Sequence, residues 1–252
     1  MSHVCHGSFL VTLATAAAFQ VLDVGPPRTG TQTLKAALEV YGFRALHTSY
    51  NYTARLPWCE YLFGGGALEP ALRTLDGYDT AMDEPFHLVY KEVMEAFPES
   101  KFLLPVKDPD EWYDNVLAAG QDLNMDLEEA AATHEMSSGF DYLAAMTLRI
   151  PSMRTCSGCI NWGCDFLNVT GKPNRERCVA SYRAHIEAVQ ATIPSHRLLL
   201  FHFSDGWAAL SHFLGQPIPD RPFPYVDDFF EEPFALKRRR DKQRIIKRHG
   251  RE

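Results

Sequence analysis

The chain has 252 residues, of which 46% are hydrophobic and 23% are charged, and its formal net charge is −7. This is the composition of a globular protein with one sizeable core. No apolar run in the sequence reaches the roughly 18 residues of a membrane span, and a mostly acidic body argues against nucleic acid as the main partner. We therefore expect no integral membrane span and no nucleic-acid binding.

Charge and hydropathy divide the chain into three regions. Residues 237–252 contain nine Lys or Arg and two acidic residues. They predict a basic C-terminal tail, which is either a solvated end or an electrostatic clamp for a phosphorylated ligand or an acidic partner. We predict an N-terminal extension at 1–18 and a single domain at 19–236. The apolar stretch at 9–18 resembles a short signal or anchor region, but no Lys or Arg precedes it, which favours a structural role.

Cysteines and glycosylation sequons leave the compartment open. Three of the six cysteines fall in CSGCINWGC at 156–164. This spacing is weak for zinc, and it fits plain thiols as well as two local disulfides. Asn51 and Asn168 begin sequons, which matter only in the secretory pathway. The sequence is compatible with the cytoplasm and with the lumen of the Golgi or secretory pathway.

Strand and helix patterns alternate along the chain. Apolar runs that end in glycine, proline or aspartate are typical of buried strands, and apolar residues three and four apart are typical of helices. The predicted elements, in chain order, are a strand at 19–24, a helix at 31–41, a strand at 43–47, a helical region at 52–75 broken by Pro57 and by the glycines at 64–66, a strand at 78–82, a helix at 86–97, a strand at 101–106, a helix at 110–119, an insertion without sheet at 120–174, a helix at 175–193, a strand at 197–203, a helix at 206–214 and an irregular segment at 215–224.

This alternation, with continuous apolar strands, predicts an α/β fold whose central parallel sheet is covered by helices on both faces. Ligands of such sheets bind at the carboxyl ends of the strands. The segments 25–33, 83–85 and 107–115 each follow a predicted strand. We therefore expect them to converge on one crevice.

The segment after the first strand reads GPPRTGTQT at 25–33. The spacing from Gly25 to Gly30 is that of a nucleotide phosphate loop, in which backbone amides and a helix N-terminus hold an anion. A kinase or ATPase needs Lys followed by Ser or Thr after the second glycine, and this chain has Thr31 and Gln32 there. The positive charge lies inside the turn, at Arg28. The alternative is a plain strand–turn–helix corner.

Three stretches resemble the sulfotransferases that use 3′-phosphoadenosine 5′-phosphosulfate (PAPS). PPRTGTQTLKAAL at 26–38 is similar to their 5′-phosphosulfate loop, and FLLPVKDPDEWYDNV at 102–116 to their 3′-phosphate-binding strand and helix. The stretch 182–224 resembles the C-terminal half of a widespread, mostly uncharacterised branch of this family. The resemblance covers most of 20–228, and it implies a fold like that of the P-loop nucleoside triphosphate hydrolases.

The resemblance assigns the donor site. It implies that Arg28 lies beside the bridging oxygen of PAPS and stabilises the leaving phosphate. It also implies 3′-phosphate contacts from Lys107 and Asn115, where the family has Arg and Ser, so this chain keeps the charge but loses the bidentate fork. The residues that would bind the 5′-phosphate are Thr29, Gly30, Thr31, Gln32 and Thr33. No metal is required, because the sulfuryl group is already activated.

A sulfuryl acceptor needs a general base. Asp83, in Asp-x-Pro at a strand end, is our first candidate, and its alternative role is to cap a helix that starts at Phe86. Glu84 should point the other way in an extended segment. His47 is the second candidate base, although a structural histidine is the more usual interpretation. Tyr182 and His185 would serve either packing or acceptor contacts, while Trp112 and Trp207 are predicted in the core.

These features favour a PAPS-dependent sulfotransferase that acts on a hydroxyl or amine of a small-molecule or glycan acceptor. Two alternatives remain at this point. One is a catalytically silent binding or scaffold protein on the same fold, and the weaker one is a nucleotide kinase or NTPase. The acceptor depends on 48–75 and 120–174, which carry no interpretable motif.

Overall fold

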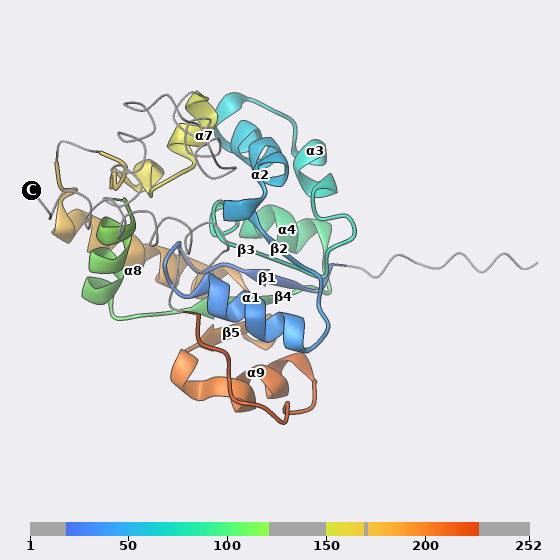
Figure 1. The fold of residues 1–252 in the computed structure, drawn as a ribbon. Helices are drawn as coiled ribbons and strands as arrows, with labels where there is room; N and C mark the ends of the chain where they lie inside the picture. Colours follow the sequence, from blue (N-terminus) through green and yellow to red (C-terminus); the bar gives the residue numbers. More distant parts are fainter. Residues whose placement is uncertain (1–18, 121–149, 169–170, 227–252) are drawn as a thin grey trace, which may run out of the picture.

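A computed structural model describes residues 19–120, 150–168 and 171–226 (Figure 1). The predicted extension at 1–18, the basic tail at 237–252 and residues 121–149 of the predicted insertion lie outside the described residues. No helix among the described residues is long and apolar enough to cross a membrane.

The described chain forms an α/β fold, as the sequence predicts. Five strands form one sheet in the order β2-β3-β1-β4-β5, and every neighbouring pair is parallel. The strands are β1 (Val21–Asp23), β2 (Ala45–His47), β3 (Thr80–Met82), β4 (Lys101–Pro105) and β5 (Leu198–Phe201). The helices are α1 (Thr31–Val40), α2 (Tyr52–Cys59), α3 (Leu68–Arg73), α4 (Tyr90–Ala96), a helix at 109–120, α7 (Pro151–Thr155), α8 (Arg175–Thr192) and α9 (Gly206–Leu214).

Side-chain alternation along the strands builds a core on each face of the sheet. In β1, Val21 packs toward α1 and α9, where Leu34, Leu38 and Leu210 are fully buried. Leu22 points to the opposite face, because successive strand residues alternate. The two helices α1 and α9 therefore cover one face in Figure 1.

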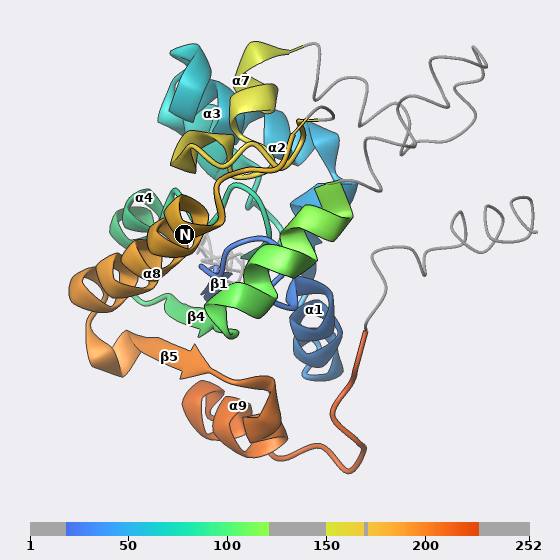
Figure 2. The same ribbon diagram turned by 90° about the vertical axis from the view of Figure 1, so that its left-hand side faces the viewer.

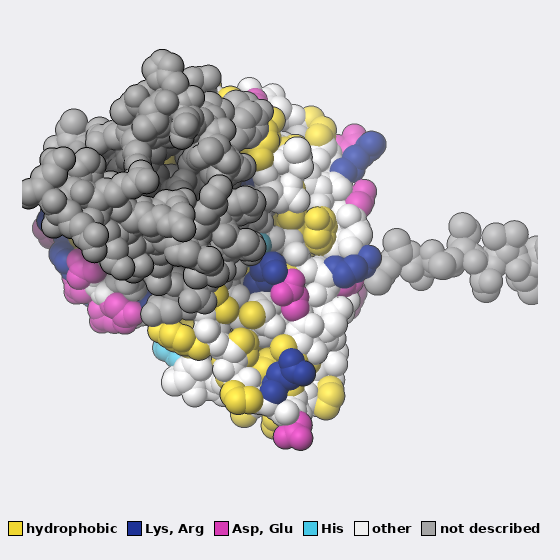
Figure 3. Space-filling model, viewed as in Figure 1, with side chains coloured by type: hydrophobic (Ala, Val, Ile, Leu, Met, Phe, Trp, Pro, Cys, Tyr) yellow, Lys and Arg dark blue, Asp and Glu magenta, His cyan; other side chains and the backbone are white. Residues whose placement is uncertain are grey.

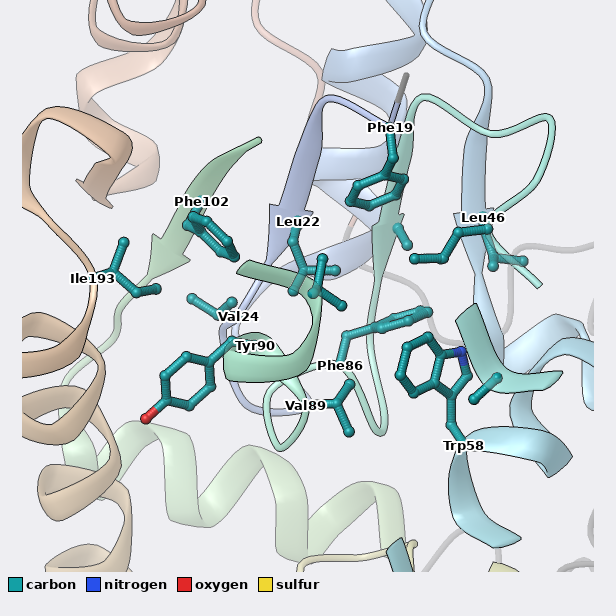
Figure 4. Packing of buried hydrophobic residues seen from close by; sticks show 14 of the residues in the cluster. Phe19, Leu22, Val24, Leu46, Trp58, Phe86, Val89, Tyr90, Phe102 and Ile193 are labelled. Carbon is teal, nitrogen blue, oxygen red and sulfur yellow. The ribbon is translucent and has the colours of Figure 1, made fainter. Parts of the chain in front are cut away.

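The second core lies under α2, α4 and α8. Leu22 and Phe102 from the sheet pack with Trp58 of α2, Val93 of α4 and Val189 of α8, all of them fully buried. Figure 4 shows the sheet residues of this cluster directed toward the segment that follows β3. Burial on both faces explains why the strands read as continuous apolar runs.

Several element boundaries differ from the prediction. The strand predicted at 197–203 ends at Phe201, and a single helical turn follows at Phe203–Asp205. The helix predicted at 86–97 begins only at Tyr90. Before it, the amides of Phe86 and Leu88 donate to the carbonyls three residues earlier, at 2.8 Å each, so this stretch consists of tight turns.

The predicted break at Pro57 is wrong. The helix α2 runs through Pro57 to Cys59, a π-helical turn follows at Glu60–Gly64, and the break comes at the predicted glycines, where Gly65 is left-handed. The two residues after Pro57 anchor the end of α2, because Trp58 lies in the core and Cys59 forms a disulfide.

The described part of the insertion contains no strand, as predicted, and two disulfides attach it to the domain. Cys59 of α2 bonds to Cys156, 97 residues away, and Cys164 bonds to Cys178 of α8, 14 residues away. The first bond is thus long-range rather than local, while Cys159 is a buried thiol.

The two disulfides should differ in their contribution to stability. A cross-link removes more entropy from the unfolded chain when it closes a longer loop, so the Cys59→Ala/Cys156→Ala variant should lose more free energy of unfolding than Cys164→Ala/Cys178→Ala, by about 1–2 kcal/mol. Denaturant unfolding of both variants beside the wild type measures this. An equal loss, or a larger loss for the second pair, would contradict the prediction.

Candidate active site

The predicted site segments lie at one edge of the sheet. His47 ends β2, Asp83 follows β3, the loop at 25–30 follows β1, and Lys107 lies two residues after β4. Because these four strands are parallel neighbours, their carboxyl ends face the same side. Figure 2 views the molecule from this side, with the helix at 109–120 crossing in front of β1.

Internal hydrogen bonds fold the loop after β1 into a tight turn. The carboxylate of Asp23 accepts a bond from the amide of Gly25 at 2.7 Å. Thr29 donates to the carbonyl of Pro26 from its amide, at 3.3 Å, and from its hydroxyl, at 2.7 Å. Arg28 and Gly30 both have positive φ, of 67° and 106°.

Two close approaches explain the glycines of this loop. A Cβ on Gly25 would lie 2.6 Å from Cγ of Pro105, and one on Gly30 would lie 2.5 Å from the ring of Phe203. Gly30 also precedes α1 and has no side chain to cap the amides of its first turn. The positive end of the α1 dipole is therefore directed at the mouth of the loop.

Aromatic side chains from distant segments hold the loop from behind. Trp112 is fully buried, and its indole N–H donates to the carbonyl of Pro27 at 3.0 Å. Its ring stacks on Tyr182 with centroids 4.6 Å apart. Nε2 of His185 lies 2.8 Å from the carbonyl oxygen of Val24. Trp112 is thus in the core, as predicted, and Tyr182 and His185 make packing and backbone contacts.

Tyr182 also fixes the segment after β4, since its hydroxyl accepts a bond from the amide of Lys107 at 3.0 Å. Trp207 is buried as predicted, and its indole donates to the carbonyl of Arg221 at 2.8 Å. The hydroxyl of Thr33, at the end of the loop motif, accepts a hydrogen bond from the amide of Val226 at 2.9 Å.

Asp83 lies at the centre of a buried polar chain. Its Oδ2 accepts a hydrogen bond from the hydroxyl of Ser49 and lies 3.7 Å from Nδ1 of His47. Nε2 of His47 in turn lies 3.0 Å from Oγ1 of Thr31, in the phosphate-loop motif. Burial lowers the pKa of His47, and the Asp83 carboxylate partly opposes this.

This arrangement corrects the alternative role of Asp83. No helix starts at Phe86, so Asp83 does not cap one, although its carbonyl accepts the amide of Phe86 in a turn. Ser49 was missed in the sequence. Its position two residues after a strand was a weak signal, and its contact with Asp83 spans 34 residues.

Glu84 joins a second polar cluster, separate from the contacts of Asp83, but the segment is not extended as predicted, because Asp83 has a positive φ of 77°. Nη2 of Arg55 donates to Oε2 of Glu84 and to the hydroxyl of Ser157, at 2.6 Å each. Burial raises the pKa of Glu84 to about 7, and the Arg55 guanidinium opposes this rise. Arg55 therefore joins the insertion to the residue beside Asp83.

The two predicted 3′-phosphate residues come together around a third residue. Nζ of Lys107 lies 3.0 Å from Oε1 of Glu111, and Nδ2 of Asn115 donates to the same oxygen at 3.5 Å. Lys107, Glu111 and Asn115 are spaced four residues apart, and all three side chains are at least partly exposed. A carboxylate thus occupies the position between the two donors where an anion would be expected.

The described surface and side chains add two observations. On the face in Figure 3, the visible Lys and Arg side chains are scattered rather than gathered in one patch, and several lie beside Asp or Glu side chains. Within 19–120, 150–168 and 171–226, no three His, Cys, Asp or Glu residues group in a way that would hold a metal ion.

Comparison with known proteins gives a consistent result. The family described as "Sulfotransferase domain" matches residues 20–230. "Ava biosynthesis cluster protein M" of Aspergillus versicolor is 24% identical over 223 residues, which cover 82% of this chain and 80% of that protein. A solved sulfotransferase from Alicyclobacillus acidocaldarius aligns over 90% of this chain and 91% of its own, with 14% identity and a TM-score of 0.45. Since the family match spans most of its length, this chain belongs to the sulfotransferase domain family.

Proposed function

We propose that this protein transfers a sulfuryl group from PAPS to a hydroxyl or amine of a small-molecule or glycan acceptor. One observation carries the proposal. The phosphate-loop residue Thr31 and the candidate base Asp83 are joined through His47, by contacts of 3.0 Å and 3.7 Å. A loop suited to a nucleotide phosphate and a carboxylate suited to an acceptor therefore face each other across one side chain.

The loop would bind the donor through its backbone and its charge. The amides at 29–33 and the N-terminus of α1 suit the 5′-phosphate. Arg28, inside the turn, would stabilise the negative charge that develops on the bridging oxygen as the sulfur–oxygen bond breaks. The nucleotide would leave as 3′-phosphoadenosine 5′-phosphate (PAP).

Asp83 would act as the general base. Ser49 and His47 both contact Oδ2, so we assign the contact with the acceptor to Oδ1. This second oxygen would take the proton from the acceptor hydroxyl or amine, while the acceptor atom bonds to sulfur and PAP departs with the electron pair. His47 is the weaker candidate for this role, because burial and contacts at both nitrogens keep its ring from the acceptor.

Lys107 and Asn115 would receive the 3′-phosphate, with Glu111 displaced from between them. The same contact favours one second candidate function, a catalytically silent nucleotide-binding or scaffold protein, because Glu111 already pairs with the charge of Lys107. A kinase or NTPase is less supported, since no Lys follows Gly30.

Calorimetric titration tests the function directly. PAP should bind without magnesium, and Mg-ATP should bind poorly, because the loop lacks the lysine that contacts a γ-phosphate. Preference for Mg-ATP would contradict the proposal, and failure to bind either nucleotide would favour the scaffold.

Replacing Asp83 by Asn should separate catalysis from binding. A general base contributes about 100- to 10,000-fold, so turnover should fall by that order while PAP affinity changes little. The exposed Asp76→Asn variant is the matched control and should keep full turnover. Retained activity in Asp83→Asn would remove this carboxylate as the base.

Glu111→Gln should improve binding of the 3′-phosphate. Removing a partly exposed carboxylate partner from Lys107 should raise PAP affinity by about two- to five-fold. The affinity for adenosine 5′-phosphate, which lacks the 3′-phosphate, should stay unchanged, as should both affinities in the exposed Glu99→Gln control. If Glu111→Gln shifts both nucleotides equally, the 3′-phosphate site lies elsewhere.

A further inference from the structure

The contact chain from Thr31 through His47 to Asp83 is almost completely shielded from solvent. The three residues are 6%, 5% and 5% exposed. They come from the start of α1, the end of β2 and the turn after β3, so the sheet holds their spacing. The imidazole ring lies between the other two side chains, 3.0 Å from Oγ1 of Thr31 and 3.7 Å from Oδ2 of Asp83.

The hydroxyl of Thr31 has a single proton to donate. When His47 is neutral with its proton on Nδ1, facing Asp83, the bare Nε2 accepts the proton of Thr31. A phosphate oxygen on the donor nucleotide has no proton to offer, so Thr31 must donate to it. The oxygen of Thr31 then has to accept a bond from a protonated Nε2.

A neutral ring protonated on Nε2 would present a lone pair to the carboxylate of Asp83. An imidazolium has a proton on each nitrogen and satisfies both neighbours. In the absence of nucleotide, burial lowers the pKa of His47 and keeps it neutral near neutral pH. The charged groups that act on the ring are Asp83, Lys35 and Glu39 of α1, and Arg55 of α2. Binding of a phosphate adds a second anion on the side of Nε2.

We propose that His47 takes up a proton from solvent when the 5′-phosphate of the donor nucleotide binds Thr31, and that the resulting imidazolium holds the carboxylate of Asp83 in place. This inference rests on the proposed function. The imidazolium would place a positive charge 3.7 Å from Oδ2 of Asp83, and so hold this carboxylate beside the loop while the nucleotide is bound. His47 is thus a positioning residue.

Proton uptake on binding PAP tests the inference. Titrations near neutral pH in buffers of different ionisation enthalpy give the number of protons bound with the nucleotide. The wild type should take up a substantial fraction of one proton. The His47→Gln variant keeps an amide for Thr31 but cannot ionise, so it should lose this uptake, while PAP still binds. Because both proteins bind the same ligand, protonation of PAP itself cancels in the comparison.

Variants at both ends of the chain sharpen the test. Thr31→Ser keeps the hydroxyl and should keep the uptake, whereas Thr31→Val should lose it. The exposed His196→Gln variant is the control and should match the wild type. In ¹⁵N spectra, a histidine signal that is absent in His47→Gln should change from neutral imidazole to imidazolium when PAP binds.

Each remaining outcome overturns the inference. Uptake that persists in His47→Gln or in Thr31→Val places the proton elsewhere. PAP binding without proton uptake in the wild type overturns the coupling and leaves the proposed function intact. Absence of PAP binding overturns both. Circular dichroism and thermal unfolding of each variant identify any that has failed to fold, and the histidine signal of the wild type decides the question in that case.

Discussion

The site depends on how closely the loop after β1 approaches β4. Gly25 leaves no room for a Cβ beside Pro105, and Gly30 leaves none beside Phe203. The loop can therefore turn sharply beside the end of β4 and the turn after β5. Helix α1 then starts with its amides facing the strand ends. Buried donors and acceptors then fix its shape, since Trp112 and His185 contact the carbonyls of Pro27 and Val24. The other candidate site residues, at the ends of β2, β3 and β4, lie around this turn.

The segment after β3 divides its two acidic residues between separate tasks. Asp83 joins the chain of contacts that leads to the loop, and Glu84 pairs with Arg55 on the other side of the strand. The backbone at Asp83 makes this division possible, because its positive φ of 77° turns the chain at this residue, and the side chains of Asp83 and Glu84 then reach different surroundings. Asp83 and the ion pair of Glu84 with Arg55, which ties down the insertion, are consequently adjacent in sequence but face different surroundings.

The fold and the loop could be predicted because their signals are local. Continuous apolar runs and the spacing of Gly25 and Gly30 are properties of a few neighbouring residues. The contacts of Ser49 with Asp83 and of Arg55 with Glu84 join segments 34 and 29 residues apart, and no local pattern encodes them. Glu111 was within reach of sequence reasoning, since four-residue spacing places its side chain beside Lys107 on one helical face. Helix α2 continued past Pro57 because tertiary burial outweighed local preference.

The bond between Cys59 and Cys156 closes a covalent ring around much of the site. The ring contains β3, Asp83, β4, Lys107 and the helix at 109–120, whereas the loop after β1 lies outside it. A single peptide-bond cleavage anywhere between the two cysteines would therefore leave one covalently connected molecule, and the two pieces would separate only after reduction. The chain also cannot complete this ring until residue 156 has been synthesised, by which time Asp83 and both strands next to β1 are already part of the nascent polypeptide.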